Sequence, residues 1–84
     1  MENIIIYSKP NCSWCTLLKE LLFRMNLPYF EYLLGENITK EELIKAIGND
    51  IKPLLVPQIY IQNQRIGGYK EFIEYCQKNN IELK

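Results

Sequence analysis

The sequence predicts an α/β fold in which a mixed four-stranded sheet is flanked by three helices. Short runs of β-branched and aromatic residues alternate with segments whose apolar residues recur at helical spacing. The chain has 84 residues, which is enough for one hydrophobic core and too few for two. Its 48% hydrophobic and 24% charged residues are typical of a globular protein. We therefore expect one domain spanning residues 1–84.

The first strand and the first helix are expected to meet at a short polar turn. Residues 4–7 are three isoleucines and a tyrosine, and the turn-forming residues 8–11 follow them. From Ser13 onward, apolar residues recur on one side of a predicted helix: Trp14, Leu17, Leu18, Leu21, Leu22 and Met25. Pro28 disfavours helical geometry in the residue before it, so the helix should end at residues 26–28.

The middle of the chain predicts a second strand and a second helix. Residues 29–34 have strand composition, and residues 35–37 form a turn. Thr39 and Glu42 have the spacing of a capping box at the start of a helix over residues 39–47. Gly48 can adopt the left-handed conformation that ends a helix. Residues 49–57 are expected to form a loop.

The last third predicts a hairpin and a third helix. Residues 58–62 alternate like a strand, and residues 63–64 are a plausible turn into residues 65–66. Gly67 and Gly68 then open a helix whose apolar face is formed by Tyr69, Phe72, Ile73 and Cys76. Because crossover connections make the first two strands parallel, the order of elements fits a thioredoxin-like architecture.

Charge and cysteine content exclude several classes of function. Ten basic and ten acidic residues cancel and are scattered, which argues against nucleic acid or a membrane as partner. In the first thirty residues, the longest apolar run is residues 4–7, so we expect the protein to stay in a reducing cytoplasm. Three cysteines are an odd number, which argues against a structural disulfide framework.

Cys12 and Cys15 lie where the first strand meets the first helix. The amide groups and the dipole at a helix N-terminus stabilise a thiolate, and Lys9 adds a positive charge in the same turn. The pKa of Cys12 is therefore expected to fall to roughly 3.5–7.5. Cys15 lies one helical turn further on and can attack a mixed disulfide formed at Cys12. This arrangement predicts a nucleophile at Cys12 and a resolving thiol at Cys15.

Two other interpretations apply to the cysteines. Two cysteines separated by two residues also suit zinc or an iron–sulfur cluster, but the chain has no histidine and only one further cysteine, Cys76. A complete four-ligand site within one chain is therefore not expected. Cys76 is expected to pack in the core, as buried free cysteines usually do. Trp14 has the helical phase of a core residue and also lies beside the thiols, so both core packing and a substrate surface stay open.

Three segments together resemble the glutaredoxins along the whole chain. They are residues 9–15 (KPNCSWC), residues 56–61 (VPQIYI) and residues 67–69 (GGY). The longer loop at residues 48–53 looks most like phage-type glutaredoxins, some of which donate electrons to ribonucleotide reductase. The resemblance implies a monomeric thiol–disulfide oxidoreductase with no tightly bound cofactor. It also implies glutathione as reductant and disulfide-containing proteins, with ribonucleotide reductase as a candidate, as electron acceptors.

The resemblance also assigns a glutathione site. It implies that Pro57 is a cis-proline facing the dithiol and that Val56 offers its backbone to the cysteinyl part of glutathione. It further implies that Lys9 attracts a glutathione carboxylate and that Trp14 lines the groove. By the same resemblance, the γ-glutamyl end would be bound by Gly68, Tyr69, Lys70 and Glu71. Independently, two glycines before a helix can expose bare N–H groups to an anion, although an ordinary glycine-rich turn is the alternative interpretation.

Two alternative functions would also use Cys12. In the first, thioredoxin reductase replaces glutathione as the electron source, and Lys70 at a position commonly occupied by aspartate or serine leaves this route open. In the second, the protein carries an iron–sulfur cluster between two subunits, with Cys12 and glutathione as ligands. Ser13 stands where proline is common in the family, and some family members with serine at this position bind such a cluster.

Overall fold

The computed structural model describes residues 3–48 and 56–83. The elements follow the predicted order along the chain: β1 (Ile4–Ser8), α1 (Ser13–Arg24), β2 (Phe30–Leu33), α2 (Lys40–Ile47), β3 (Gln58–Ile61), β4 (Gln64–Gly67) and α3 (Tyr69–Lys78). The four strands form one sheet in the spatial order β2-β1-β3-β4. β1 pairs in parallel with β2, and the other two pairings are antiparallel, so the predicted mixed sheet is confirmed.

The main core lies between the sheet and the helices α1 and α3. Alternate residues of β1 and β3 point into it, and they meet the apolar faces of the two helices. Its buried members are Ile4, Ile6, Leu18, Leu21, Leu22, Ile59, Ile61, Phe72 and Cys76. Burying a side chain of this size contributes roughly 1.5–3 kcal/mol. This core fixes the orientation of α1 and therefore of the cysteines at its start.

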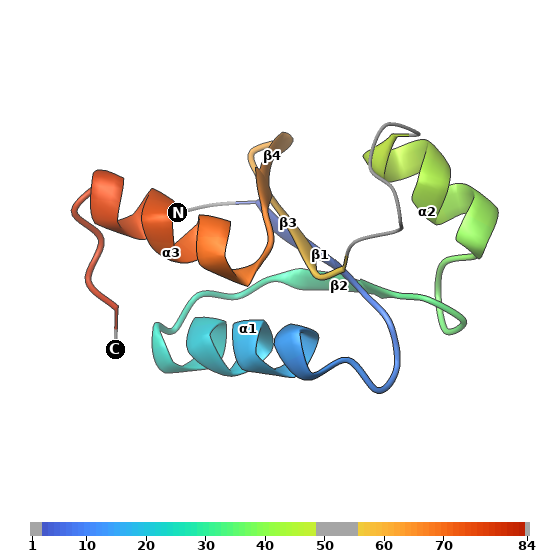
Figure 1. Ribbon diagram of the computed structural model, residues 1–84, viewed down its shortest axis with the longest axis horizontal. Helices are drawn as coiled ribbons and strands as arrows, with labels where there is room; N and C mark the ends of the chain where they lie inside the picture. Colours follow the sequence, from blue (N-terminus) through green and yellow to red (C-terminus); the bar gives the residue numbers. More distant parts are fainter. Residues whose placement is uncertain (1–2, 49–55, 84) are drawn as a thin grey trace.

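A smaller core contains α2. Figure 1 shows α2 apart from α1 and α3, which lie together on the other side of the fold. Three buried residues, Ile38, Leu43 and Ile47, form this second core, and tyrosines of the sheet pack against it. Tyr7 stacks on Tyr32 with ring centroids 5.2 Å apart and meets Tyr60 edge-on at 5.5 Å. None of the helices within the described residues has the length and apolar character needed to cross a membrane.

The hairpin between β3 and β4 turns one residue earlier than predicted. The turn residues are Gln62 and Asn63, with φ of 51° and 65°, rather than the expected residues 63–64. Both central residues thus adopt the left-handed backbone that a two-residue turn of the favoured type requires. Glutamine is a weak signal for this conformation, which explains the displaced prediction.

The first helix also differs from its predicted pattern at one residue. Leu17 was expected on the apolar face, yet its side chain is 42% exposed. The buried residues of α1 are Cys15, Leu18, Leu21 and Leu22, and Leu17 lies on the flank of this stripe, three residues after Trp14. The helix ends at Arg24, two residues before the predicted boundary.

The capping box of α2 is confirmed and can be tested. The hydroxyl of Thr39 accepts a hydrogen bond from the Glu42 amide at 3.1 Å, and the Glu42 carboxylate accepts one from the Thr39 amide at 2.8 Å. Thr39→Ala should lower the free energy of unfolding by about 1 kcal/mol, because one N-terminal amide loses its acceptor. Thr39→Ser keeps the acceptor and is the control. Urea unfolding that shows equal losses for both variants would contradict the role of the cap.

Candidate active site

Cys12 is the N-cap residue of α1. Its backbone is extended, with φ −117° and ψ 105°, and its carbonyl accepts the first helical hydrogen bond from the Thr16 amide at 3.1 Å. Asn11, just before it, has φ 56°, a conformation that asparagine tolerates better than most residues. The Cys12 sulfur lies 3.2 Å from the Cys15 amide nitrogen, so sulfur occupies the place that a serine or aspartate oxygen usually takes in a cap.

The electrostatic setting at this helix end favours a negative charge on sulfur. The unpaired amides and the dipole of α1 are positive at their N-terminus, and no acidic residue lies in the first turn of the helix. The nearest backbone donor already points at the sulfur. In the reduced protein these groups would stabilise a Cys12 thiolate relative to its thiol.

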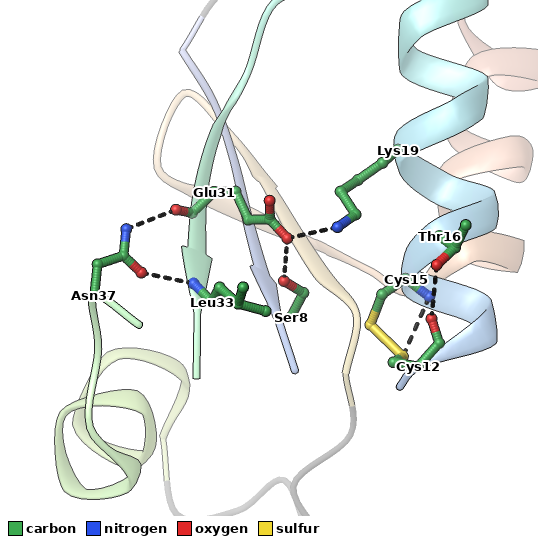
Figure 2. Close-up of polar contacts among 8 residues, drawn as sticks. All are labelled: Ser8, Cys12, Cys15, Thr16, Lys19, Glu31, Leu33 and Asn37. Carbon is green, nitrogen blue, oxygen red and sulfur yellow. Dashed lines mark hydrogen bonds and ion pairs between the residues drawn. A yellow bond between two sulfur atoms is a disulfide. The ribbon is translucent and has the colours of Figure 1, made fainter. Parts of the chain in front are cut away.

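Cys15 is the buried partner of Cys12. Its side chain is 1% exposed, whereas Cys12 is only partly buried. The two residues form a disulfide, with their α-carbons 5.2 Å apart (Figure 2). The pair can therefore exchange electrons as a dithiol and a disulfide. The asymmetry in burial matches the predicted roles of an accessible attacking sulfur and a sheltered resolving sulfur.

Val56 and Pro57, just before β3, lie near the dithiol. The peptide bond between Val56 and Pro57 is cis, as the resemblance implied. The Val56 carbonyl oxygen lies 3.8 Å from the Cys12 sulfur, although the two residues are 44 positions apart in the sequence. The backbone at Val56 is thus placed where a molecule bound to Cys12 would pass. Residues 49–55, which include most of the loop on which the phage-type resemblance rests, lie outside the described residues.

An open groove of about 220 Å³ runs beside Val56 and Pro57. It brings together three segments that are distant in the sequence, and its lining residues are Trp14, Val56, Pro57, Gln58, Gly68, Tyr69, Lys70 and Glu71. Seven of these eight were assigned to glutathione by the resemblance, and Gln58 was not. The Trp14 side chain is 54% exposed, and its ring lies 5.6 Å from that of Tyr69. Of the two roles left open for Trp14, the structure favours the surface one.

The start of α3 differs from the prediction in one respect. Gly67 belongs to β4, and Gly68 is the N-cap of the helix. The Gly68 amide was expected to be bare, but it donates a hydrogen bond of 2.8 Å to the carboxylate of Glu71. Gly67 has φ 125°, and a β-carbon there would lie 2.7 Å from that of Glu71, so glycine is required for this close approach.

Lys9 stands apart from the groove. It is exposed in the turn between β1 and Cys12, and it is not among the residues that line the groove. Its assignment to a glutathione carboxylate therefore stays a prediction. Its place in the chain, three residues before Cys12, still allows its charge to act on the sulfur.

A polar network lies on the side of α1 that faces the sheet (Figure 2). The Ser8 hydroxyl donates a hydrogen bond to the Glu31 carboxylate, and the Lys19 ammonium lies 2.9 Å from the same carboxylate oxygen. Burial raises the pKa of Glu31, but the hydrogen bonds from Ser8 and Lys19 and the charge of Lys19 outweigh it. As a result, the pKa of Glu31 is lowered from its ordinary value.

The third cysteine belongs to the core. Cys76 is fully buried, as predicted, and burial raises the pKa of its thiol. Within residues 3–48 and 56–83, no group of three or more His, Cys, Asp or Glu side chains is placed to hold a metal ion. A cluster shared between two subunits would use one thiolate from each, so that alternative stays a prediction.

The sequence did not reveal Gln58, Glu31 or Lys19 as neighbours of the site. Gln58 is 4% exposed at the start of β3, directly after the cis-proline. A signal for Glu31 existed, because it is the one charged residue in the apolar segment 29–34. In a strand with alternating faces, its position makes it point to the same side of the sheet as its partner Ile6, toward α1.

Known proteins match this chain over most of its length. The family model described as glutaredoxin matches residues 4–66. The glutaredoxin of Vibrio cholerae is 34% identical over 82 residues, which cover 90% of this chain and 92% of that protein. The solution structure of reduced glutaredoxin C1 from Populus tremula x tremuloides is 27% identical, with a TM-score of 0.75 over 93% of this chain and 67% of that one.

A complex of buckwheat glutaredoxin with glutathione has the same fold. It superimposes with a TM-score of 0.71 at 20% identity and covers 93% of this chain and 71% of the buckwheat chain. The thioredoxin-like fold expected from the order of elements is thereby confirmed.

The lowered pKa of Glu31 predicts how stability depends on pH. The unfolded chain binds a proton at this carboxyl more readily than the folded protein does. The contribution of the Glu31 carboxyl to the free energy of unfolding is therefore fully present above the ordinary pKa of 4.5. It is lost as pH falls through the lower pKa of the folded protein. In Glu31→Gln, the free energy of unfolding should decline less steeply below pH 4.5 than in the unmodified chain.

Urea unfolding at several pH values between 2 and 7 measures this slope. Glu20→Gln, at an exposed position of the same helix as Lys19, is the matched control and should keep the steep decline. A curve for Glu31→Gln parallel to that of the unmodified chain would show that the carboxyl titrates alike in both states.

Proposed function

The chain belongs to the glutaredoxin family of thiol–disulfide oxidoreductases, and on this basis we propose that it reduces protein disulfides and glutathione mixed disulfides, with glutathione as its reductant. The observation that carries the proposal is the Cys12 sulfur, which accepts a hydrogen bond from the Cys15 amide and lies 3.8 Å from the carbonyl oxygen of Val56, a residue that lines the groove. The location in a reducing cytoplasm stays a prediction from the sequence.

The first step is nucleophilic attack by Cys12. In the reduced protein the Cys12 thiolate attacks one sulfur of a substrate disulfide, forms a new sulfur–sulfur bond and breaks the old one. The second substrate sulfur leaves as a thiolate and takes a proton from solvent. The helix amides that stabilised the charge on Cys12 favour this step by keeping the attacking sulfur ionised at neutral pH.

The second step is resolution by Cys15. Its thiol loses a proton, and its sulfur attacks Cys12, which forms the Cys12–Cys15 disulfide and releases the second half of the substrate as a thiol. The two protein thiols have then lost two electrons, and the substrate disulfide has gained them. Two glutathione molecules return the protein to the dithiol by the reverse exchanges and leave as one glutathione disulfide.

The groove offers a glutathione molecule contacts along its length. Held by a disulfide to Cys12, it would pair its cysteinyl backbone with Val56 and lay its chain along the neighbouring rings of Trp14 and Tyr69. Its γ-glutamyl end carries an ammonium and a carboxylate, and the charges of Glu71 and Lys70, which line the groove, are complementary to them. The buckwheat neighbour, which shares this fold, is a complex with glutathione.

One observation favours a second source of electrons. The Gly68 amide donates its hydrogen bond to the Glu71 carboxylate. A carboxylate of glutathione would otherwise accept that hydrogen bond at the start of α3. A weaker glutathione site would suit a carrier that thioredoxin reductase reduces. Ribonucleotide reductase is a candidate acceptor on either route, and this rests on the resemblance to phage-type glutaredoxins alone.

Serine substitutions separate the roles of the two cysteines. Cys12→Ser should lose at least 100-fold in turnover of a glutathione mixed disulfide, on the order of what removal of a nucleophile costs. Cys15→Ser should lose reduction of protein disulfides while it keeps removal of glutathione from mixed disulfides, because the latter needs only Cys12 and free glutathione. Assays coupled to glutathione reductase measure both. Full activity of Cys12→Ser would overturn the assignment of the nucleophile.

The reductant is identified by a direct comparison of rates. The oxidised protein is mixed either with glutathione and glutathione reductase or with thioredoxin reductase, and NADPH consumption is followed with the same protein disulfide as final acceptor. We expect the glutathione route to be at least tenfold faster. A faster thioredoxin reductase route would replace the main proposal with the second one.

A further inference from the structure

The network of Ser8, Glu31 and Lys19 has no part in the mechanism above. Ser8 is fully buried, and the side chains of Glu31 and Lys19 are 24% and 30% exposed. Removing an ammonium and a carboxylate from water costs several kcal/mol each, and their attraction often does no more than offset this cost. Stability alone therefore gives a weak reason for a charged pair at the edge of the main core.

The network lies on the same side of α1 as the resolving cysteine, and none of its three residues lines the groove. Lys19 follows Cys15 by one helical turn, so both lie on the same side of α1. Ser8 is the last residue of β1, and only the turn of residues 9–11 separates it from Cys12. Figure 2 shows the Ser8 hydroxyl and the Glu31 carboxylate between the strands and α1, on the side of the helix that carries the dithiol.

The two charges act on a nearby thiol in opposite directions. The Lys19 ammonium favours a thiolate at Cys15, and the Glu31 carboxylate disfavours it. Because Cys15 is shielded from solvent, both effects are stronger than they would be at the surface. The other titratable groups of the described chain at this end of the fold are Lys9, Cys12, Tyr69, Lys70 and Glu71.

We propose that Glu31 is a positioning residue that cancels the charge of Lys19 and so keeps the resolving thiol of Cys15 protonated until a mixed disulfide has formed at Cys12. Ser8 holds the carboxylate in place through its hydrogen bond. With Cys15 neutral, the reduced dithiol carries one negative charge, on Cys12, and substrate is attacked only there. In the resolving step the Cys15 proton is transferred to the departing thiolate, so charge and electrons balance as described for the second step.

This inference rests on the proposed roles of Cys12 and Cys15, but its test does not require glutathione turnover. The Cys12→Ser background keeps a good N-cap residue and leaves Cys15 and the core residue Cys76 as the thiols. Carbon-13 labelling of the cysteine β-carbons lets NMR follow each thiol separately as the pH is raised. The measured quantity is the proton affinity of the Cys15 thiol.

Opposite shifts are expected for the two halves of the pair. Glu31→Gln should lower the proton affinity of Cys15 by about tenfold, and Lys19→Gln should raise it by a similar factor. The double variant should return close to the starting value. A merely structural role predicts a different pattern, because loosening the packing at either residue would affect Cys15 in the same direction.

Glu20→Gln is the matched control, since it makes the same change at an exposed position of α1, and it should leave the Cys15 titration unmoved. Far-ultraviolet circular dichroism checks that each variant is folded. Shifts of Cys15 in the same direction for Glu31→Gln and Lys19→Gln, or none in either, would overturn the inference. If the shifts are opposite and the glutathione assay of the unmodified protein fails, the inference stands and the choice of glutathione falls.

Discussion

The Cys15 amide lies 3.2 Å from the sulfur of Cys12, and the chemistry of the molecule depends on this contact. It exists because Cys12 is the N-cap of α1, where backbone amides lack helical acceptors. The left-handed Asn11 turns the chain from β1 into that cap. The parallel pairing of β1 with β2 and the main core hold α1 against the sheet, so the amides stay aimed at one sulfur.

Burial distinguishes the two sulfurs, and it follows from the helix stripe. Cys15 belongs to the face of α1 that includes Leu18 and Leu22, so the packing that stabilises the helix also shields this thiol. Cys12, at the end of the helix, stays beside the open groove. A single amphipathic helix therefore provides one accessible sulfur and one sheltered sulfur. The ion pair of Glu31 and Lys19 places two opposite charges on the side of α1 that carries the buried thiol of Cys15.

Local patterns in the sequence predicted the elements well, because each has a clear apolar period and clear end signals. The capping box at Thr39 and Glu42 and the cysteines at the strand-to-helix junction are examples. The turn of the hairpin was predicted one residue too late in the chain, because Gln62 is an atypical residue for a positive φ. The occupied Gly68 amide was missed, although Glu71 stands three residues after Gly68, the same spacing that predicted the capping box of Thr39 and Glu42.

Contacts between distant segments were predictable only through the family resemblance or not at all. The cis peptide before Pro57 and the groove residues came from that resemblance, because no local pattern distinguishes a cis from a trans proline there. The pairing of Glu31 with Lys19 joins β2 to α1 across the core edge and depends on sheet register, which the sequence alone left open.

The most direct test of the central claim is the pH dependence of alkylation at Cys12 in the reduced protein. Iodoacetamide reacts with the thiolate, and mass spectrometry assigns the product to each cysteine. If the helix amides hold the sulfur ionised, the rate at Cys12 will reach half its maximum below about pH 7.5. A half-maximal rate near pH 8.5, the value of an ordinary cysteine, would contradict the account.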